Sequence, residues 1–169
     1  AFEHSGLSGG ITLPASLTSI GNSAFYWCSS LTSVNFESGS QLETIGGGAF
    51  DGTINQCLIT PDSGGNVLIL ASIRSIEPLA FFGCTSLTSV SFESGSQLTT
   101  IAVAAFWGSG LSGGITLPAS LTSIGNYAFR SCSSLTSVNF ESGSQLTTIG
   151  VSAFEHSGLS GGITLPASL

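Results

Sequence analysis

Residues 17–34 read Leu17-Thr18-Ser19-Ile20-Gly21-Asn22-Ser23-Ala24-Phe25-Tyr26-Trp27-Cys28-Ser29-Ser30-Leu31-Thr32-Ser33-Val34. The same pattern returns from Leu121 to Val138, and with less fidelity from Ile73 to Val90. Its Ala-Phe pair recurs with the phenylalanine at Phe2, Phe25, Phe50, Phe81, Phe106, Phe129 and Phe154, so successive phenylalanine numbers differ by 23, 25, 31, 25, 23 and 25. A unit this short cannot bury its apolar side chains alone, so neighbouring units must stack on one another. The repeat therefore predicts a solenoid of about seven turns.

Each turn contains two apolar stretches at fixed distances from the phenylalanine. The positions nine residues on are Ile11, Val34, Ile59, Val90, Ile115, Val138 and Ile163, and those eleven on are Leu13, Phe36, Pro61, Phe92, Leu117, Phe140 and Leu165. A small polar residue separates them, which is the period of two that predicts a half-buried strand. A second pair, such as Leu17 and Ile20, stands eight and five residues before the next phenylalanine. We expect short parallel strands stacked into a sheet, with the Ala-Phe pair also facing inward.

The stretch from Leu17 to Val34 resembles the BspA-like, or Treponema-type, leucine-rich repeats, whose pattern is Leu-x-x-Ile-Gly-x-x-Ala-Phe-x-x-Cys-x-x-Leu. The resemblance covers essentially the whole chain. It implies a mainly β, right-handed leucine-rich-repeat solenoid, with one turn for each phenylalanine spacing of 23 to 25. It also implies a non-enzymatic bacterial or protozoan surface protein that binds host proteins, matrix or other cells.

The composition excludes two classes of partner. The chain of 169 residues has 2 basic and 9 acidic residues, for a formal charge of −7. Two arginines cannot neutralise a row of phosphates, so nucleic acids and anionic membranes are not expected partners. No apolar run approaches the roughly 18 to 20 residues of a membrane span. The apolar fraction of 41% distinguishes the chain from disordered sequences, which are poor in large apolar residues.

Residues 153–169 repeat residues 1–17 without a change. We therefore interpret 1–169 as a single array and as a window of a longer chain. The third turn, residues 49–79, is irregular, and we place an insertion at residues 63–72. Because Val67 to Leu70 are too apolar for a free loop, we expect an extra short strand or flap there, which is also a candidate contact site.

Three cysteines share one position, three residues after the phenylalanine: Cys28, Cys84 and Cys132. Cys28 and Cys84 are two turns apart, or roughly 10 Å, which exceeds the ~7 Å Cα limit for a disulfide. We expect buried thiols, although Cys57 lies off this column and its pairing with Cys28 or Cys84 stays open. The spacing does not favour a metal site, and no cofactor is expected.

Two groups of titratable residues carry weak functional signals. His4 and His156 are copies of one corner position, with only serines and an adjacent glutamate nearby, so we do not expect catalysis. Glu37, Asp62 and Glu93 stand twelve residues after the phenylalanine in three consecutive turns. We expect a solvated acidic edge there, and a bound cation is the alternative.

The clearest candidate binding residues flank the Ala-Phe pair. Residues 1–48 and 105–152 are near-identical copies, and most of their differences lie beside that pair. Aromatic residues and arginine gather there, as in binding hot spots. The candidate residues for partner binding are Tyr26, Trp27, Phe82, Trp107, Tyr127 and Arg130. The alternative interpretation is neutral variation, because this corner tolerates many types of residue.

We therefore predict an extracellular or cell-surface repeat protein that binds protein partners, whether host, matrix or self. The second hypothesis is a subunit of an extracellular fibre built by end-to-end stacking, because neither end of the sequence shows a polar cap. Ice binding is a remote third, prompted by the low charge and the column Thr12, Asn35, Thr60, Ser91, Thr116, Asn139 and Thr164.

Overall fold

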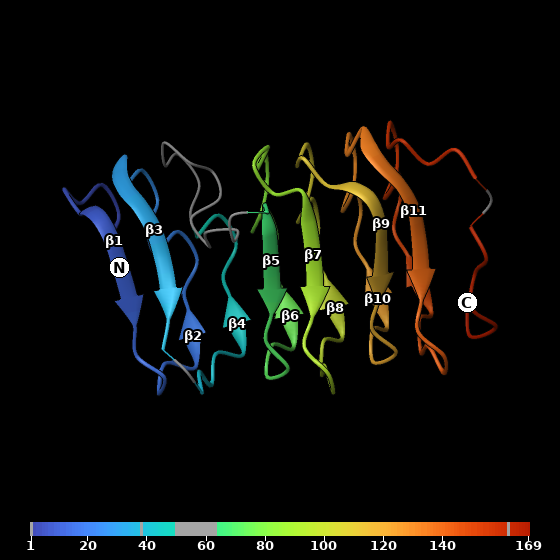
Figure 1. The fold of residues 1–169 in the computed structure, drawn as a ribbon, viewed down its shortest axis with the longest axis horizontal. Helices are drawn as coiled ribbons and strands as arrows, with labels where there is room; N and C mark the ends of the chain where they lie inside the picture. The colour runs from blue at the N-terminus through green and yellow to red at the C-terminus, as the bar shows by residue number, and fades with distance from the viewer. Residues whose placement is uncertain (1, 38, 50–63, 162) are drawn as a thin grey trace.

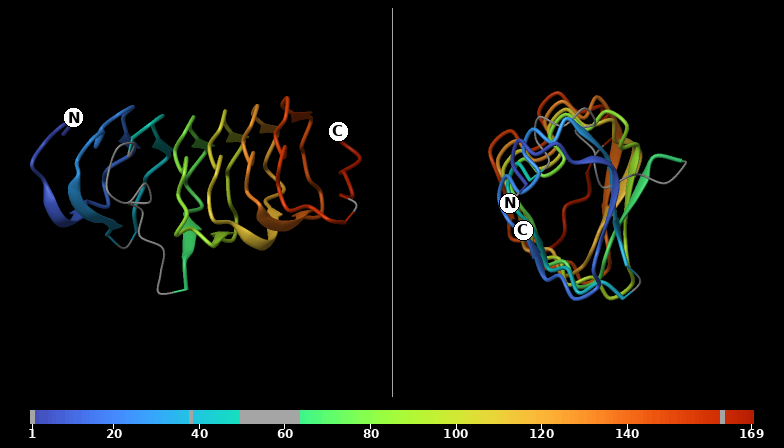
Figure 2. Two further views of the ribbon diagram at one scale, coloured as in Figure 1. Left: turned by 90° about the horizontal axis from the view of Figure 1, so that it is seen from above. Right: turned by 90° about the vertical axis from the view of Figure 1, so that its left-hand side faces the viewer.

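The computed structural model describes residues 2–37, 39–49, 64–161 and 163–169. Within these residues the secondary structure consists of β-strands and turns, without a helix. The strands repeat along one axis as successive turns of a solenoid, and viewed down that axis the turns share one outline (Figures 1 and 2). The strands are β1 (Ser8–Leu13), β2 (Ser19–Ile20), β3 (Ser30–Phe36), β4 (Thr44–Ile45), β5 (Asn66–Ile69), β6 (Ser75–Ile76), β7 (Ser89–Phe92), β8 (Thr100–Ile101), β9 (Ser112–Leu117), β10 (Ser123–Ile124), β11 (Ser134–Phe140) and β12 (Thr148–Ile149). The predicted parallel solenoid is confirmed.

The even-numbered strands form one continuous sheet along the solenoid. It has six strands in the order β12-β10-β8-β6-β4-β2, and every pair is parallel. Each strand is two residues long and ends on a core isoleucine, so Ile20 pairs with Ile45 and Ile101 with Ile124. The short strands are the second apolar stretch of each turn. Their polar residue faces outward while the isoleucine packs inward.

The longer, odd-numbered strands pair two by two. The described residues form three two-stranded parallel sheets, β1-β3, β5-β7 and β9-β11, instead of the single sheet we expected in this column. Paired residues are 23 positions apart, as for Ile11 and Val34 or Ile115 and Val138. Val90 and Ile115 are 25 positions apart, and β7 and β9 are not hydrogen-bonded as a ladder. The two additional residues of the longer turn therefore coincide with a break in strand pairing.

The third turn differs from the sequence-based assignment. Val67 to Ile69 belong to β5, which pairs in register with β7 through Val67–Val90 and Ile69–Phe92. Val67 and Ile69 are buried, and Leu68 between them is exposed. This segment thus occupies the regular strand column of the solenoid. Ile59 and Pro61, which the spacing assigned to that column, lie outside the described residues.

The core is built from the predicted columns. Phe25, Phe81, Phe106 and Phe129 are buried, and the last three stack face to face with ring centroids 5.0 and 5.1 Å apart. Burying one such side chain stabilises the fold by about 1.5–3 kcal/mol relative to leaving it exposed. The backbone also links these turns, because the N–H of Phe106 donates a hydrogen bond to the carbonyl oxygen of Ala128 at 2.8 Å. Stacked copies of one residue therefore form a continuous apolar column.

The cysteines only partly follow the expectation. Cys28 and Cys132 are buried free thiols. The Cys28 thiol donates to the carbonyl of Phe2 at 2.9 Å, and the Cys132 thiol to the carbonyl of Phe106 at 3.1 Å, so each bridges to the preceding turn. Cys84 is disulfide-bonded, which corrects the expectation of a thiol there. Cys57 lies outside the described residues.

Candidate binding surface

Each Ala-Phe pair sits in a tight corner of the backbone, which we define as the segment from two residues before to two residues after the phenylalanine. Two positions of this corner adopt left-handed φ angles. Two residues before the phenylalanine these are Ser23, Gly48, Leu79, Ala104, Tyr127 and Ser152, and two residues after it they are His4, Trp27, Gly83, Gly108, Ser131 and His156. Such angles suit glycine and cost other L-residues roughly 1–2 kcal/mol each. Leu79, Tyr127 and Trp27 therefore carry bulky side chains at backbone angles that favour glycine.

Four predicted binding residues form one cluster that extends over three stacked corners. The Phe82 and Trp107 rings make an edge contact with centroids 5.7 Å apart, and Trp107 and Tyr127 are 5.8 Å apart. The Arg130 guanidinium lies 4.9 Å from the Trp107 centroid and 5.4 Å from that of Tyr127. We call Phe82, Trp107, Tyr127 and Arg130 the aromatic cluster. Three consecutive turns of the solenoid contribute to it.

An ion pair fixes the arginine of the aromatic cluster. Nη1 of Arg130 lies 3.3 Å from Oε2 of Glu155, and both side chains are partly exposed. A guanidinium held by two rings and a carboxylate loses little side-chain freedom when a partner binds. The cluster is thus preorganised for contact with another molecule.

The other two predicted residues, Tyr26 and Trp27, belong to a second group with His4. The His4 ring lies 5.7 Å from that of Tyr26 and 6.4 Å from that of Trp27, and Trp27 is 52% exposed. This group lies on two stacked Ala-Phe corners, those around Phe2 and Phe25. The residues between the two groups include 50–63, which lie outside the described part of the chain.

Sequence reasoning missed three exposed apolar residues on the turns around Phe81, Phe106 and Phe154. Leu79 is 39% exposed, Val103 is 45% exposed and Val151 is 67% exposed. They lie two or three residues before the phenylalanine of their turns. The signal that was missed lies three residues before the phenylalanine. Other turns have glycine or asparagine at this position, at Gly47, Asn22 and Asn126, whereas two turns have valine, at Val103 and Val151.

The acidic edge has a structural role at each described position. Oε2 of Glu37 accepts a hydrogen bond from the N–H of Ala15, at 3.0 Å. Glu93 and Glu141 do the same for Ala71 and Ala119, at 2.7 and 2.9 Å. Each glutamate therefore satisfies a backbone N–H in the bend of the preceding turn, and its own side chain remains exposed. Asp62, the third residue predicted for this edge, lies outside the described residues.

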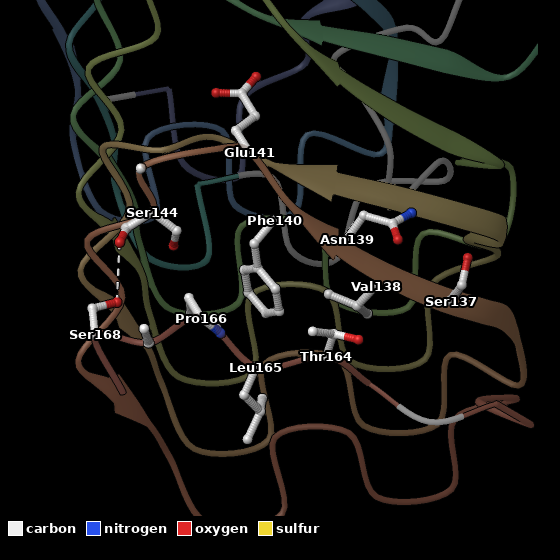
Figure 3. A pocket seen from close by; sticks show the side chains of 12 residues that line it. Ser137, Val138, Asn139, Phe140, Glu141, Ser144, Thr164, Leu165, Pro166 and Ser168 are labelled. Atoms are coloured by element: carbon white, nitrogen blue, oxygen red, sulfur yellow. Dashed lines mark hydrogen bonds between the residues drawn. The ribbon is translucent and has the colours of Figure 1, made fainter.

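A hollow of about 440 Å³ lies between β11 and the segment Thr164 to Ser168 (Figure 3). Val138 and Phe140 of β11 and Leu165 line it, together with polar residues such as Asn139 and Thr164. A smaller hollow of about 280 Å³ lies beside Val90, Phe92 and Gly114, where β7 and β9 do not pair. Both hollows occur where equivalent residues of neighbouring turns are 25 positions apart, instead of 23.

The titratable groups of the described residues were compared with what metal binding requires. No group of three or more His, Cys, Asp or Glu residues among them could hold a metal ion. His4 lies 3.9 Å from its neighbour Glu3, and both are exposed. Burial raises the pKa of the Cys132 thiol, and hydrogen bonds with Ser109 oppose this in part.

Among the residues that the structure describes, no helix is long and apolar enough to span a membrane.

Comparison with solved structures gives three relatives of the same architecture. The pneumococcal vaccine antigen PcpA is 31% identical with a TM-score of 0.66, over 80% of this chain and 31% of that one. A leucine-rich repeat protein from Bacteroides ovatus is 28% identical with a TM-score of 0.62, over 92% and 36% of the two chains. A leucine-rich cell surface protein from Faecalibacterium prausnitzii is 25% identical with a TM-score of 0.57, over 82% and 40%. The chain thus spans about a third of the length of the first two. No curated protein sequence matches it.

One family description covers the whole chain. The BspA type leucine rich repeat region matches residues 1–68 and 63–169, with six copies. These matches agree with the stacked turns, the buried Ala-Phe column and the free cysteine of the motif at Cys28 and Cys132. The chain belongs to the BspA-type leucine-rich repeat family.

Proposed function

We propose that this chain is the protein-binding part of a cell-surface or secreted protein, and that its partner contacts the aromatic cluster. Membership in a leucine-rich repeat family and the cell-surface relatives support the general role. The single observation that carries the location is the arrangement of Arg130 between Trp107, Tyr127 and Glu155. Tryptophan, tyrosine and arginine are the residues that most often dominate binding energy. The role is non-enzymatic.

Exposed apolar residues support the same surface. Leu79 is 39% exposed on the turn that carries Phe82, and Val103 is 45% exposed on the turn that carries Trp107. Left-handed φ angles do not distinguish this surface, because Ser23 and Ser152 adopt them at the same position in other turns. We infer that the partner is a protein with a complementary apolar patch.

Adhesion measured with matched variants tests this proposal. Beads coated with the chain are applied to immobilised basement-membrane extract, and the fraction retained is measured. Trp107→Ala should reduce retention at least fivefold, because loss of a hot-spot side chain costs more than about 1 kcal/mol. Trp27→Ala tests the second aromatic group in the same way.

Thr116→Ala is the control, since Thr116 is exposed on β9, away from the corner. It should retain the beads as the unchanged chain does. Equal retention by Trp107→Ala and the unchanged chain, with the same circular dichroism, would contradict the location of the site.

Ice binding receives no support from the strand arrangement. The column of Thr12, Thr116 and its equivalents is divided among separate two-stranded sheets, and Leu68 interrupts it. A regular array that orders water needs a continuous flat row. Assembly into a filament stays a prediction.

A further inference from the structure

Exposed apolar side chains gather on one side of the solenoid. The described residues include nine large apolar side chains that are exposed, and four of them lie within three positions of the phenylalanine in the turns of Phe81, Phe106 and Phe154. These four are Leu79, Phe82, Val103 and Val151. The corners of successive turns stack along the solenoid, because the turns share one outline when viewed down its axis (Figure 2). A contiguous apolar patch often marks a contact surface.

The four exposed residues belong to two rows that cross four consecutive turns, those of Phe81, Phe106, Phe129 and Phe154. One row lies one residue after the phenylalanine, and the other lies two or three residues before it. The first row is Phe82, Trp107, Arg130 and Glu155, and the second row is Leu79, Val103, Tyr127 and Val151. We call the two rows together the corner stripe. Neighbours in the first row are in direct contact along its whole length, through two rings, a cation–π contact and an ion pair.

The corner stripe has an aromatic end and a charged end. Its first row begins with Phe82 and Trp107 and continues with Arg130 and Glu155. A two-fold axis that crosses the stripe midway between its second and third turns reverses the order of the turns, but it leaves each row opposite itself. Trp107 then faces Arg130 of a second copy, and Phe82 faces Glu155 of that copy. The stripe is therefore complementary to its own reverse.

The residues that face each other in this arrangement are chemically matched. A guanidinium such as that of Arg130 is attracted to a tryptophan face, as it is to Trp107 within one chain. The edge of the Phe82 ring carries partial positive charge and suits the carboxylate of Glu155. In the second row, Leu79 faces Val151, and both side chains are exposed in a single copy. Pairing therefore buries apolar surface, and the ion pair within each chain is kept.

The distance between turns favours a second copy over other protein partners. Parallel strands lie about 4.8 Å apart, and two copies share this step, so their contacts stay in register over all four turns. An α-helix rises about 5.4 Å per turn, and side chains on one face of a strand are about 6.8 Å apart, so neither matches the stripe. The residues after the first row include Gly83, Gly108 and Ser131, which are small enough to let two backbones approach closely.

We propose that the corner stripe binds the corner stripe of a second copy of this chain in antiparallel orientation. The proposal rests on the proposed function, because it names the protein that the aromatic cluster binds. The pair is closed by its two-fold axis, so it forms a dimer and not a filament. Four turns give a small interface, and each copy carries a formal charge of −7, so the dimer is weak and depends on concentration.

Two single-cysteine variants of the full chain test the arrangement. Leu79→Cys and Val151→Cys are each oxidised alone and as an equimolar mixture, and covalent dimers are measured on a non-reducing gel. In the antiparallel pair each new thiol lies three turns, or roughly 14 Å, from its own equivalent, which exceeds the ~7 Å Cα limit for a disulfide. The thiols at 79 and 151 face each other, whereas Cys28 and Cys132 are buried and should not compete. The mixture should therefore form at least fivefold more covalent dimer than either variant alone. Equal amounts in all three samples, or higher multimers, would overturn the proposal.

Sedimentation equilibrium from micromolar to millimolar concentration tests the contribution of the aromatic cluster. The unchanged chain should pass from monomer to dimer, and Trp107→Ala should raise the dissociation constant at least fivefold, as loss of a hot-spot residue does. Thr116→Ala is the control and should leave it unchanged, since Thr116 is exposed on β9. A chain that stays monomeric, or a dimer that Trp107→Ala does not weaken, would overturn the pairing.

The bead assay separates this proposal from the proposed function. A monomeric chain whose bead retention still depends on Trp107 would remove the pairing and leave the proposed function in place. A dimer that Trp107→Ala weakens, with bead retention unaffected by that variant, would support the pairing and contradict the proposed binding of another protein.

Discussion

Gly125 lies so close to the backbone of Ala102 that a Cβ at Gly125 would be 2.7 Å from the carbonyl carbon of Ala102. The nitrogen of Val103 would be equally near. Backbone atoms cannot rotate away as the end of a flexible side chain can. The glycine of the motif therefore sets how closely successive turns approach at the beginning of each Ala-Phe corner.

Gly125→Ala should lower the free energy of unfolding by about 1–3 kcal/mol, because overpacking forces the two turns apart. Gly21 is the equivalent residue of an earlier turn, and no described atom lies within 4 Å of its Cβ position. Gly21→Ala is thus the matched control and should change stability little. Urea unfolding followed by circular dichroism measures both variants, and equal losses would show that close approach is not the reason for the glycine.

Leu79→Gly should stabilise the fold by up to about 1 kcal/mol, because it relieves a left-handed φ of 62° at an exposed position. Leu68→Gly removes a similarly exposed leucine from the strand β5, where glycine costs about 0.5–1 kcal/mol. The two variants should therefore shift the thermal midpoint in opposite directions. If both lowered it, strain at Leu79 would not be significant.

Phe129→Ala should destabilise the chain by about 3–5 kcal/mol, since the ring is fully buried between Phe106 and Phe154. Trp27→Ala removes a larger side chain that is 52% exposed and should cost far less. Chemical unfolding compares the two. A small effect of Phe129→Ala would mean that the neighbouring turns close over the cavity.

Stability should decrease at alkaline pH because of Cys132. Burial raises the pKa of this thiol above its ordinary value of 9.0, so the folded state keeps a proton that the unfolded state loses. The difference is absent below the unfolded pKa, and stability falls as pH rises from there toward the folded pKa. Cys132→Ser should flatten the dependence of the unfolding free energy on pH above about 9. An unchanged slope would assign the alkaline loss to other groups.

Most of the core was predictable because the repeat places identical residues in identical environments. The assignment of the third turn shows the limit of counting from one side. Counting nine positions forward from Phe50 led to Ile59, whereas the described strand contains Val67. Counting back 14 positions from Phe81 reaches Val67, as it reaches Ile11 from Phe25 and Ile115 from Phe129. An insertion changes the count on one side only.

The sequence named candidate binding residues but not their geometry. Variation between near-identical copies pointed to Trp107, Tyr127 and Arg130, which the structure shows as partly buried, and their role in binding stays a prediction. The sequence could not show that the guanidinium packs on both rings and pairs with Glu155, because these contacts depend on side-chain directions across three turns. Left-handed backbone at Leu79 and Tyr127 was hidden for the same reason, since glycine signals it only in other turns.

The sequence by itself determined the repeat, the inward columns and the family, because apolar spacing depends only on the order of residues. The tertiary structure alone decided which strands pair. A strand is stable only when its N–H and C=O groups find a partner, and that partner comes from another turn. Residues 112–117 therefore form β9 beside β11 and not beside β7, although both of these strands carry a Val-x-Phe sequence. The physical reason is that strand pairing depends on the neighbouring turn as well as on the segment itself.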